Sequence, residues 1–189
     1  RMLRRIVRDS GMVVMRTDKR GVGDSEGGPC SRLDYLTELS DHRDALDHLA
    51  SSASVDPERI VVFGASMGAN LAPLVAQRRK PAGVLVWGGG ARPWFERMIA
   101  LERNRGELEG MDGDRLDAEM KLVTAFLFHY LVEGHAPERV ARDHADLANA
   151  WSLLLGTEGE THYGRPLAFH QQAQRQNWAG AWARLDVPV

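Results

Sequence analysis

The feature that most constrains this chain is the stretch Arg59–Ala72, RIVVFGASMGANLA, which passes from an apolar run to a helix-forming run with no loop between them. The run over 59–63 is rich in β-branched residues, so it predicts a buried strand. The run over 69–76 consists mainly of good helix formers. The chain must therefore turn directly from a strand into a helix over residues 64–68.

The turn itself carries the pattern Gly64-x-Ser66-x-Gly68. So abrupt a turn forces its central residue into a sparsely populated backbone conformation, and the glycines let the flanking backbones approach without a Cβ clash. This context is typical of a nucleophile elbow. It predicts Ser66 as a nucleophile and the Met67 N–H, at the start of the helix, as an oxyanion donor. Serines between glycines also occur as ordinary turn residues, and that alternative stays open here.

Composition excludes several function classes. The chain has 189 residues, a formal net charge of −2 and one cysteine, Cys30. It therefore lacks the basic surface expected for nucleic acid or an anionic membrane, and it cannot form an internal disulfide or a cysteine-rich metal site. A structural role is expected for Cys30. Without a membrane-length apolar run or a signal peptide, the cytoplasm is slightly favoured.

The first half of the chain alternates between predicted strands and helices. Residues 1–11 are typical of the tail of a helix, and the apolar runs 12–17 and 83–87 predict strands on either side of the elbow strand. A helix is expected over 33–50. This order predicts an α/β fold with a parallel sheet covered by helices on both faces.

A nucleotide-binding loop is a possible alternative after the 12–17 strand, because Gly21-x-Gly23 follows it. The third glycine of the dinucleotide-binding pattern would fall at Glu26, and no Gly-Lys-Ser/Thr supports a phosphate-binding loop. The sequence therefore predicts no cofactor.

The second half predicts helices alone from Arg92 to about Trp182. One helix begins near Pro93, a second spans roughly 114–133, and a third follows Pro137. An all-helical insertion of this kind is a common site for a lid over an active site. Its aromatic residues could shape an apolar acyl pocket; they are Trp94, Phe95, Phe126, Phe128, Trp151, Tyr163 and Phe169. The expected domains are a partial core over 1–91, a helical cap over 92–182, and the start of the next core strand over 183–189.

The combined motifs resemble the α/β-hydrolase superfamily, especially its serine-aminopeptidase-like (S33-type) and acyl-thioesterase-like branch. The resemblance covers nearly the whole chain and is weakest in the cap. The matching segments, in the family's order, are Asp18-x-Arg20-Gly21-x-Gly23-x-Ser25-x-Gly27, Val55-Asp56-Pro57-x-Arg59-Ile60, Gly64-Ala65-Ser66-Met67-Gly68 and Trp182-Ala183-x-Leu185-x-Val187-Pro188-Val189.

The resemblance implies an internal fragment that lacks the first and last strands of the fold. The first oxyanion donor would precede Arg1, and the catalytic acid and histidine would follow Val189. The family's third strand, which lies between the strands matched by 12–17 and 59–63, would also be missing. We therefore expect those two segments to lie across a gap and not to be hydrogen-bonded partners, or one of them to have shifted to close the gap.

The resemblance and the elbow favour a serine hydrolase that cleaves a small-molecule ester, thioester or amide through an acyl-enzyme on Ser66. The alternative is a non-catalytic binding module on the same fold. A metal-dependent hydrolase is not expected, because the seven histidines form no H-x-x-x-H or H-E-x-x-H pair. They are His42, His48, His129, His135, His144, His162 and His170. Of the cap histidines, His162 and His170 are the least unfavourable candidates to approach Ser66. The oligomeric state is left open.

Overall fold

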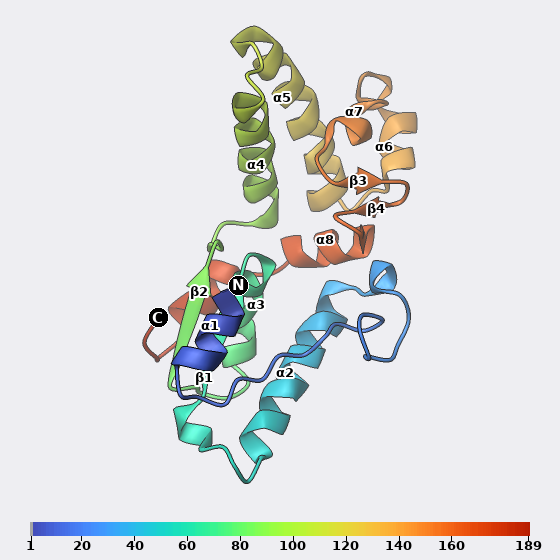
Figure 1. Ribbon diagram of the computed structural model, residues 1–189. Coiled ribbons are helices and arrows are strands. Elements are labelled where there is room, and N and C mark those ends of the chain that lie inside the picture. Colours follow the sequence, from blue (N-terminus) through green and yellow to red (C-terminus); the bar gives the residue numbers. More distant parts are fainter. Residues whose placement is uncertain (1) are drawn as a thin grey trace. The chain divides into compact units, whose positions relative to one another are not determined.

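The computed structural model describes residues 2–189, which form two compact units (Figure 1). Unit 1 contains the chain up to Gly27, residues 38–90 and residues 180–189. Unit 2 contains residues 28–37 and 91–179. Arg1, the first residue of the predicted helix tail, lies outside the described residues.

Unit 1 is built around a two-stranded parallel sheet. The strands pair in register from Val61 opposite Gly83 to Ala65 opposite Trp87. The elements that contribute to this unit are α1 (Met2–Asp9), α2 (Tyr35–Ser51, whose first three residues belong to unit 2), the 3-10 turn η2 (Pro57–Arg59), β1 (Val61–Ala65), α3 (Met67–Ala76), β2 (Gly83–Trp87) and the end of α9 (Trp178–Ala183).

The strand before the elbow begins later than predicted. Residues 57–59 form a 3-10 turn, because Pro57 occupies its first position and the Asp56 carboxylate accepts the Glu58 N–H at 3.0 Å. Arg59 ends this turn, so β1 covers 61–65 in place of 59–63.

The predicted strand over 12–17 is not formed. These residues belong to no sheet, and Met12 and Val13 are 52 % and 70 % exposed. A strand needs a neighbour to satisfy its backbone groups, and among the described residues β1 pairs with β2 alone. The expectation that this segment and β1 are not hydrogen-bonded partners is confirmed for the described residues.

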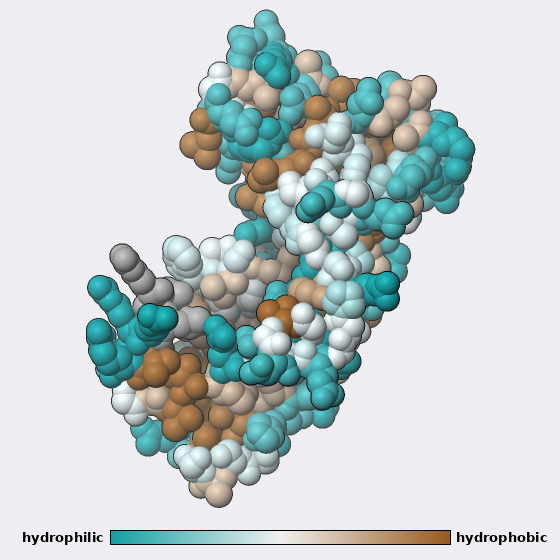
Figure 2. All heavy atoms as spheres, turned by 45° about the vertical axis from the view of Figure 1, so that its right-hand side comes forward, coloured by the Kyte–Doolittle hydropathy of each residue, from teal (hydrophilic) through white to brown (hydrophobic). Residues whose placement is uncertain are grey.

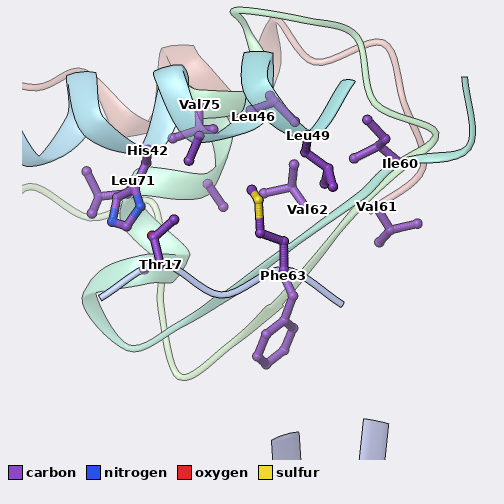
Figure 3. A pocket seen from close by; sticks show the side chains of 14 residues that line it. Thr17, His42, Leu46, Leu49, Ile60, Val61, Val62, Phe63, Leu71 and Val75 are labelled. Atoms are coloured by element: carbon purple, nitrogen blue, oxygen red, sulfur yellow. The ribbon is translucent and has the colours of Figure 1, made fainter. Parts of the chain in front are cut away.

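A hollow of about 190 Å³ lies between the 12–17 segment, β1 and α2 (Figure 3). Met15 and Thr17 line it from the segment, and Leu46 lines it from α2. In Figure 3, Val62 points toward α2 while Phe63 points to the other side of β1. The free edge of β1 therefore faces an apolar space.

Among the residues that the structure describes, helices pack closely on one face of the sheet. On that face, Ala72 and Ala76 of α3 pack with Val84 in a core that Trp182, Leu185 and Val187 extend. On the opposite face, where alternate side chains point, Val61, Leu85 and Trp87 are 46 %, 56 % and 69 % exposed. Figure 2 shows hydrophobic surface at the lower left of the view and a further area in its upper half. The prediction of helices on both faces is therefore wrong for the described residues.

The carboxyl-terminal segment runs beside β2. The Val84 N–H donates to the Pro188 carbonyl at 2.9 Å, although residues 184–189 form no assigned strand. Leu185 and Val187 pack on the same core as β2.

Unit 2 is mostly helical but also contains a small antiparallel sheet. Its elements are the 3-10 turn η1 (Cys30–Arg32), α4 (Trp94–Leu108), α5 (Gly113–Leu127), the π-helical turn η3 (Phe128–Val132), α6 (Pro137–Asp143), the 3-10 turn η4 (Ala145–Leu147), α7 (Ala150–Leu153), β3 (Thr157–Glu158), β4 (Thr161–His162), β5 (Arg165–Pro166) and α8 (Leu167–Gln174). The prediction that residues 92–182 are all helical is therefore wrong. Strands of two residues are too short to show the alternation by which strands are recognised in a sequence.

The long helices of unit 2 also differ in detail from the prediction. The helix expected over 114–133 consists of α5, capped by Asp112, and the turn η3. The turn ends at Val132, and Gly134 follows with a φ of +77° that a glycine adopts readily. The helix expected after Pro137 is broken into α6, η4 and α7.

A buried carboxylate links separate parts of unit 2. Glu102 on α4 is 1 % exposed and accepts the Leu155 N–H at 2.9 Å and the Arg105 Nε–H at 3.0 Å. The same guanidinium reaches Glu119 of α5 at 2.8 Å and the exposed Glu109 at 2.9 Å. Glu102 thus satisfies one buried backbone donor and one charge at once.

None of the helices described over residues 2–189 has both the length and the apolar character needed to cross a membrane.

Two glutamates that share Arg105 provide a test of this description of the unit 2 core. Glu102→Ala is expected to lower the free energy of unfolding by about 3 kcal/mol, because it leaves the buried Leu155 N–H without its acceptor and removes the fully buried carboxylate that pairs with Arg105. Glu109→Ala removes an exposed partner of the same arginine, so it is expected to cost no more than about 0.5 kcal/mol. Urea unfolding of both variants measures the difference. Equal costs would contradict the assigned role of Glu102.

Candidate active site

Ser66 lies at the junction of β1 and α3, where the sequence places the elbow. Its backbone has φ 54° and ψ −120°, a region that residues other than glycine rarely occupy. Its N–H donates to the Trp87 carbonyl at 2.8 Å, and its own carbonyl accepts the Ala69 N–H at 3.0 Å. These two bonds hold the strained residue between the end of β2 and the first turn of α3, and its side chain is exposed.

Met67 is the first residue of α3. The first N–H groups of a helix have no partner within the helix and lie at its positive end. The Met67 N–H therefore lies at the positive end of α3, directly after Ser66 in the chain.

The two glycines of the motif have different roles. A Cβ on Gly64 would lie 2.3 Å from the Gly68 carbonyl oxygen and 2.9 Å from the Ala69 nitrogen, so only glycine fits there. A Cβ on Gly68 would meet no atom within 4 Å among the described residues. The sequence prediction that both glycines serve a close backbone approach thus holds for Gly64 and is wrong for Gly68.

A further residue near the elbow was missed from the sequence. Asn70 is fully buried in α3, and its Nδ2 donates to the Gly90 carbonyl at 2.9 Å. A Cβ on Gly89 would lie 2.1 Å from the Ala69 Cβ, so the loop after β2 packs tightly on the first turn of α3. The available signal was a polar residue within the apolar run that follows the motif.

The glycine-rich loop over 18–28 is attached to α2 by ion pairs. The Arg20 guanidinium forms a two-bond pair with Asp41, with both distances 2.7 Å. Lys19 contacts the buried Glu38 at 3.1 Å. A Cβ on Gly27 would lie 3.2 Å from the Arg20 Cβ, which accounts for a glycine beneath that side chain. The residues of this glycine-rich loop therefore contact one another and α2, all within unit 1.

The Ser66 hydroxyl makes no hydrogen bond to any residue of 2–189. Two histidines belong to the described part of unit 1, and both lie on α2. His42 lines the hollow beside β1, where its Nε2 lies 3.7 Å from Glu38. His48 is exposed. Neither imidazole is hydrogen-bonded to the serine.

His162 and His170 occupy the core of unit 2, at 0 % and 1 % exposure. The Trp94 indole N–H donates to His170 Nδ1 at 3.1 Å, so the His170 proton is on Nε2 and is donated to the His162 carbonyl at 2.8 Å. His162 Nε2 in turn donates to the Leu155 carbonyl at 3.1 Å.

Their surroundings keep both imidazoles neutral. Burial, together with repulsion from His170, lowers the pKa of His162 to about 3. Burial also lowers the pKa of His170 to about 4. These are packed, hydrogen-bonded side chains and not accessible bases.

Unit 2 has an open groove of about 660 Å³ between α4 and α5. Phe95, Met120 and Phe128 supply apolar lining, and Arg103 and Asp117 form an ion pair at 3.0 Å beside them. Of the aromatic residues expected to shape an acyl pocket, only Phe95 and Phe128 line this groove. Three others are buried in the core of the unit: Trp94, Phe126 and Phe169.

Comparison with known proteins gives a match to one family model. The model described as "Serine aminopeptidase, S33" matches residues 3–102, which include the elbow, the glycine-rich loop and both strands of the parallel sheet. No solved structure gives a significant match to the chain.

Three curated proteins match shorter segments. The chain is 39 % identical over 62 residues to polyketide transferase claH of Penicillium crustosum, a match that covers 33 % of this chain and 20 % of that protein. It is 41 % identical over 51 residues to quorum-quenching protein AidA of Acinetobacter baumannii, a match that covers 27 % of this chain and 17 % of that protein. It is 34 % identical over 76 residues to polyketide transferase ATR5 of Stachybotrys chlorohalonatus, a match that covers 40 % of this chain and 26 % of that protein. The matched part is thus a minor share of each relative.

The two motif glycines provide a matched pair of substitutions. Gly64→Ala is expected to destabilise the chain by more than about 2 kcal/mol, because its Cβ would overlap backbone atoms that cannot move without opening the elbow. Gly68→Ala is expected to be neutral or to stabilise by up to about 1 kcal/mol, because alanine favours the helix and has space. Urea unfolding compares the two variants, and a larger loss for Gly68→Ala would contradict the assignment.

The buried histidines predict loss of stability in acid. Their folded pKa values lie below the ordinary value of 6.5, so the unfolded chain takes up protons first as the pH falls. The stability is complete above about pH 6.5 and decreases as the pH falls toward 4. At pH 5 the cost is about 2 kcal/mol for each histidine.

His162→Gln keeps an N–H near the Leu155 carbonyl but cannot be protonated. The loss of unfolding free energy between pH 7 and pH 5 is therefore expected to be about 2 kcal/mol smaller in this variant. His48→Gln, at an exposed position, serves as the control. An unchanged pH dependence in His162→Gln would show that the imidazole is not held neutral.

Proposed function

Because this chain belongs to the serine aminopeptidase (S33) family of the α/β-hydrolase superfamily, we propose that it carries the nucleophile of a serine hydrolase. The observation that supports this most is the backbone of Ser66, a non-glycine residue at φ 54° between a strand and a helix. A strained conformation is maintained only where the surrounding structure enforces it, and such residues concentrate at functional sites.

In the proposed reaction, the Ser66 Oγ attacks the carbonyl carbon of an ester, thioester or amide. The C=O π bond breaks as the Oγ–C bond forms, and the negative charge passes to the carbonyl oxygen, where the Met67 N–H stabilises it. Collapse of this intermediate expels the leaving group and forms an acyl-enzyme, which water then hydrolyses. The free N–H at the start of α3 and the exposed serine support these two roles.

A serine hydroxyl needs a base to accept its proton and a carboxylate to orient that base. The hydroxyl of Ser66 has no hydrogen-bond partner among the described residues, and His162 and His170 are buried and neutral. We therefore assign the catalytic histidine and the acid to sequence outside residues 1–189, together with the first oxyanion donor, which the resemblance to the family places before Arg1. The chain would then be the middle part of the enzyme.

We assign unit 2 the role of a cap. Its groove lies within the range of about 300–1,000 Å³ typical of small-molecule sites, and Phe95 and Phe128 give it an apolar lining suited to an acyl group. The names of the relatives include both transferases and a quorum-quenching protein, so the acceptor of the acyl group is left open.

A second candidate is a binding module that uses the same fold without catalysis. The missing partner of the Ser66 hydroxyl and the exposed apolar face of the sheet favour it. A binding module, however, gains nothing from holding an exposed serine in a strained turn, so the hydrolase is preferred.

Ser66 is expected to be the residue labelled by a fluorophosphonate in the complete parent protein, where base and acid are present. The label is identified by peptide mass spectrometry, with Ser66→Ala as the control. By contrast, residues 1–189 alone are expected to hydrolyse p-nitrophenyl butyrate no faster than their Ser66→Ala variant. Equal labelling of Ser66→Ala in the parent would contradict the nucleophile. Hydrolysis by residues 1–189 that is lost in Ser66→Ala would show that the base for Ser66 lies within these residues.

A further inference from the structure

Three side chains of unit 2 come together where α5 gives way to α6. The ligand atoms of His129, Glu133 and His135 all lie within 4.8 Å of one another. One carboxylate oxygen of Glu133 is 2.6 Å from His129 Nδ1 and 3.4 Å from His135 Nδ1. Two imidazoles thus converge on one carboxylate.

The backbone holds these residues together. His129 lies in the π-helical turn, and such turns are frequent at functional sites. Glu133 follows four residues later, and its N–H donates to the Phe128 carbonyl at 3.1 Å. Gly134, at φ +77°, reverses the chain, and the His135 N–H returns to the His129 carbonyl at 3.0 Å.

A third imidazole packs against the cluster. The ring of His144, at the carboxyl end of α6, stacks on the ring of His129 with centroids 4.1 Å apart and planes 23° apart. His144 is not one of the three residues whose ligand atoms converge. It packs against a ligand ring and limits how that ring can rotate.

We propose that His129, Glu133 and His135 form a binding site for a zinc ion. Two imidazole nitrogens and a carboxylate oxygen are donors that Zn²⁺ prefers, and three protein ligands leave a fourth tetrahedral position for water. Donors about 2.0–2.1 Å from a tetrahedral zinc lie about 3.4 Å apart, so small side-chain rotations suffice. The side chains are 19 %, 38 % and 22 % exposed, which gives an ion access from solvent.

The simpler alternative is an ion pair in which Glu133 bridges two imidazoles with no metal. The two descriptions differ in what zinc does to the protein. A zinc site would hold the α5–α6 connection together, so that zinc raises the melting temperature. An ion pair alone would leave the melting temperature unchanged at low zinc concentration.

The test is a titration of the untagged 189-residue chain with Zn²⁺ by isothermal calorimetry, together with thermal melts and the visible spectrum of bound Co²⁺. We expect one site, a rise in melting temperature and the strong visible absorption of tetrahedral Co²⁺. His129→Ala and His135→Ala are expected to weaken Zn²⁺ binding at least about a hundredfold, since even outer partners of metal ligands contribute about ten- to a hundredfold. His48→Ala removes an exposed histidine elsewhere and should bind as the unaltered chain does.

Two further variants separate ligation from packing. Glu133→Gln keeps the shape of the side chain but removes its charge, and it should weaken binding at least about tenfold. His144→Phe keeps a ring stacked on His129 but has no nitrogen, and it should leave binding unchanged. The proposal is overturned if the unaltered chain shows no saturable zinc binding and no tetrahedral Co²⁺ spectrum, or if folded His129→Ala and His135→Ala bind as well as the unaltered chain. It is also overturned if His144→Phe loses binding as completely as His129→Ala.

Discussion

The passage from β1 to α3 depends on one close contact, between Gly64 and the backbone of Gly68 and Ala69. There is no room for a Cβ at Gly64, since it would lie 2.3 Å from a carbonyl oxygen. This contact brings the first turn of the helix against the end of the strand, and Ser66 must adopt a positive φ to join them. The exposure of the serine, the free N–H at the start of the helix and the packing of the glycine loop after β2 all follow from that approach.

The parallel sheet has one strand edge that is not paired and one apolar face that is not covered by the described residues. One edge of β1 faces the hollow beside α2 and the unpaired 12–17 segment, and one face of the sheet exposes Leu85 and Trp87. Parallel sheets are ordinarily covered on both faces, because the connecting helices lie over them. Among the described residues, unit 1 thus leaves one apolar edge and one apolar face of its sheet uncovered.

The sequence was most informative where local chemistry decides structure. The elbow, β2 and α3 could be predicted because apolar runs and glycine positions act over a few residues. The start of β1 was misplaced because Asp56 and Pro57 cap a 3-10 turn that uses Arg59. Residues 12–17 have the composition of a strand, yet a strand also requires a hydrogen-bonding neighbour, and no local pattern reveals whether one is present. The two-residue strands β3–β5 depend on turns, which leave no periodic signal.

The histidines show why motif spacing alone is a poor guide to their chemistry. Fixed spacings such as H-x-x-x-H assume a continuous α-helix that places both rings on one face. Here a π-helical turn followed by a glycine at positive φ brings His135 back toward His129, a geometry that no helical spacing describes. His162 and His170, in contrast, are hydrogen-bonded to backbone and indole, and their burial among aromatic rings lowers the pKa of both and leaves them neutral. The same side chain is thus part of the core in one region of unit 2 and a proposed ligand in another. The core imidazoles, at 0–1 % exposure, are packed among aromatic rings, whereas the rings at 19 % and 22 % exposure lie beside a carboxylate and are open to solvent.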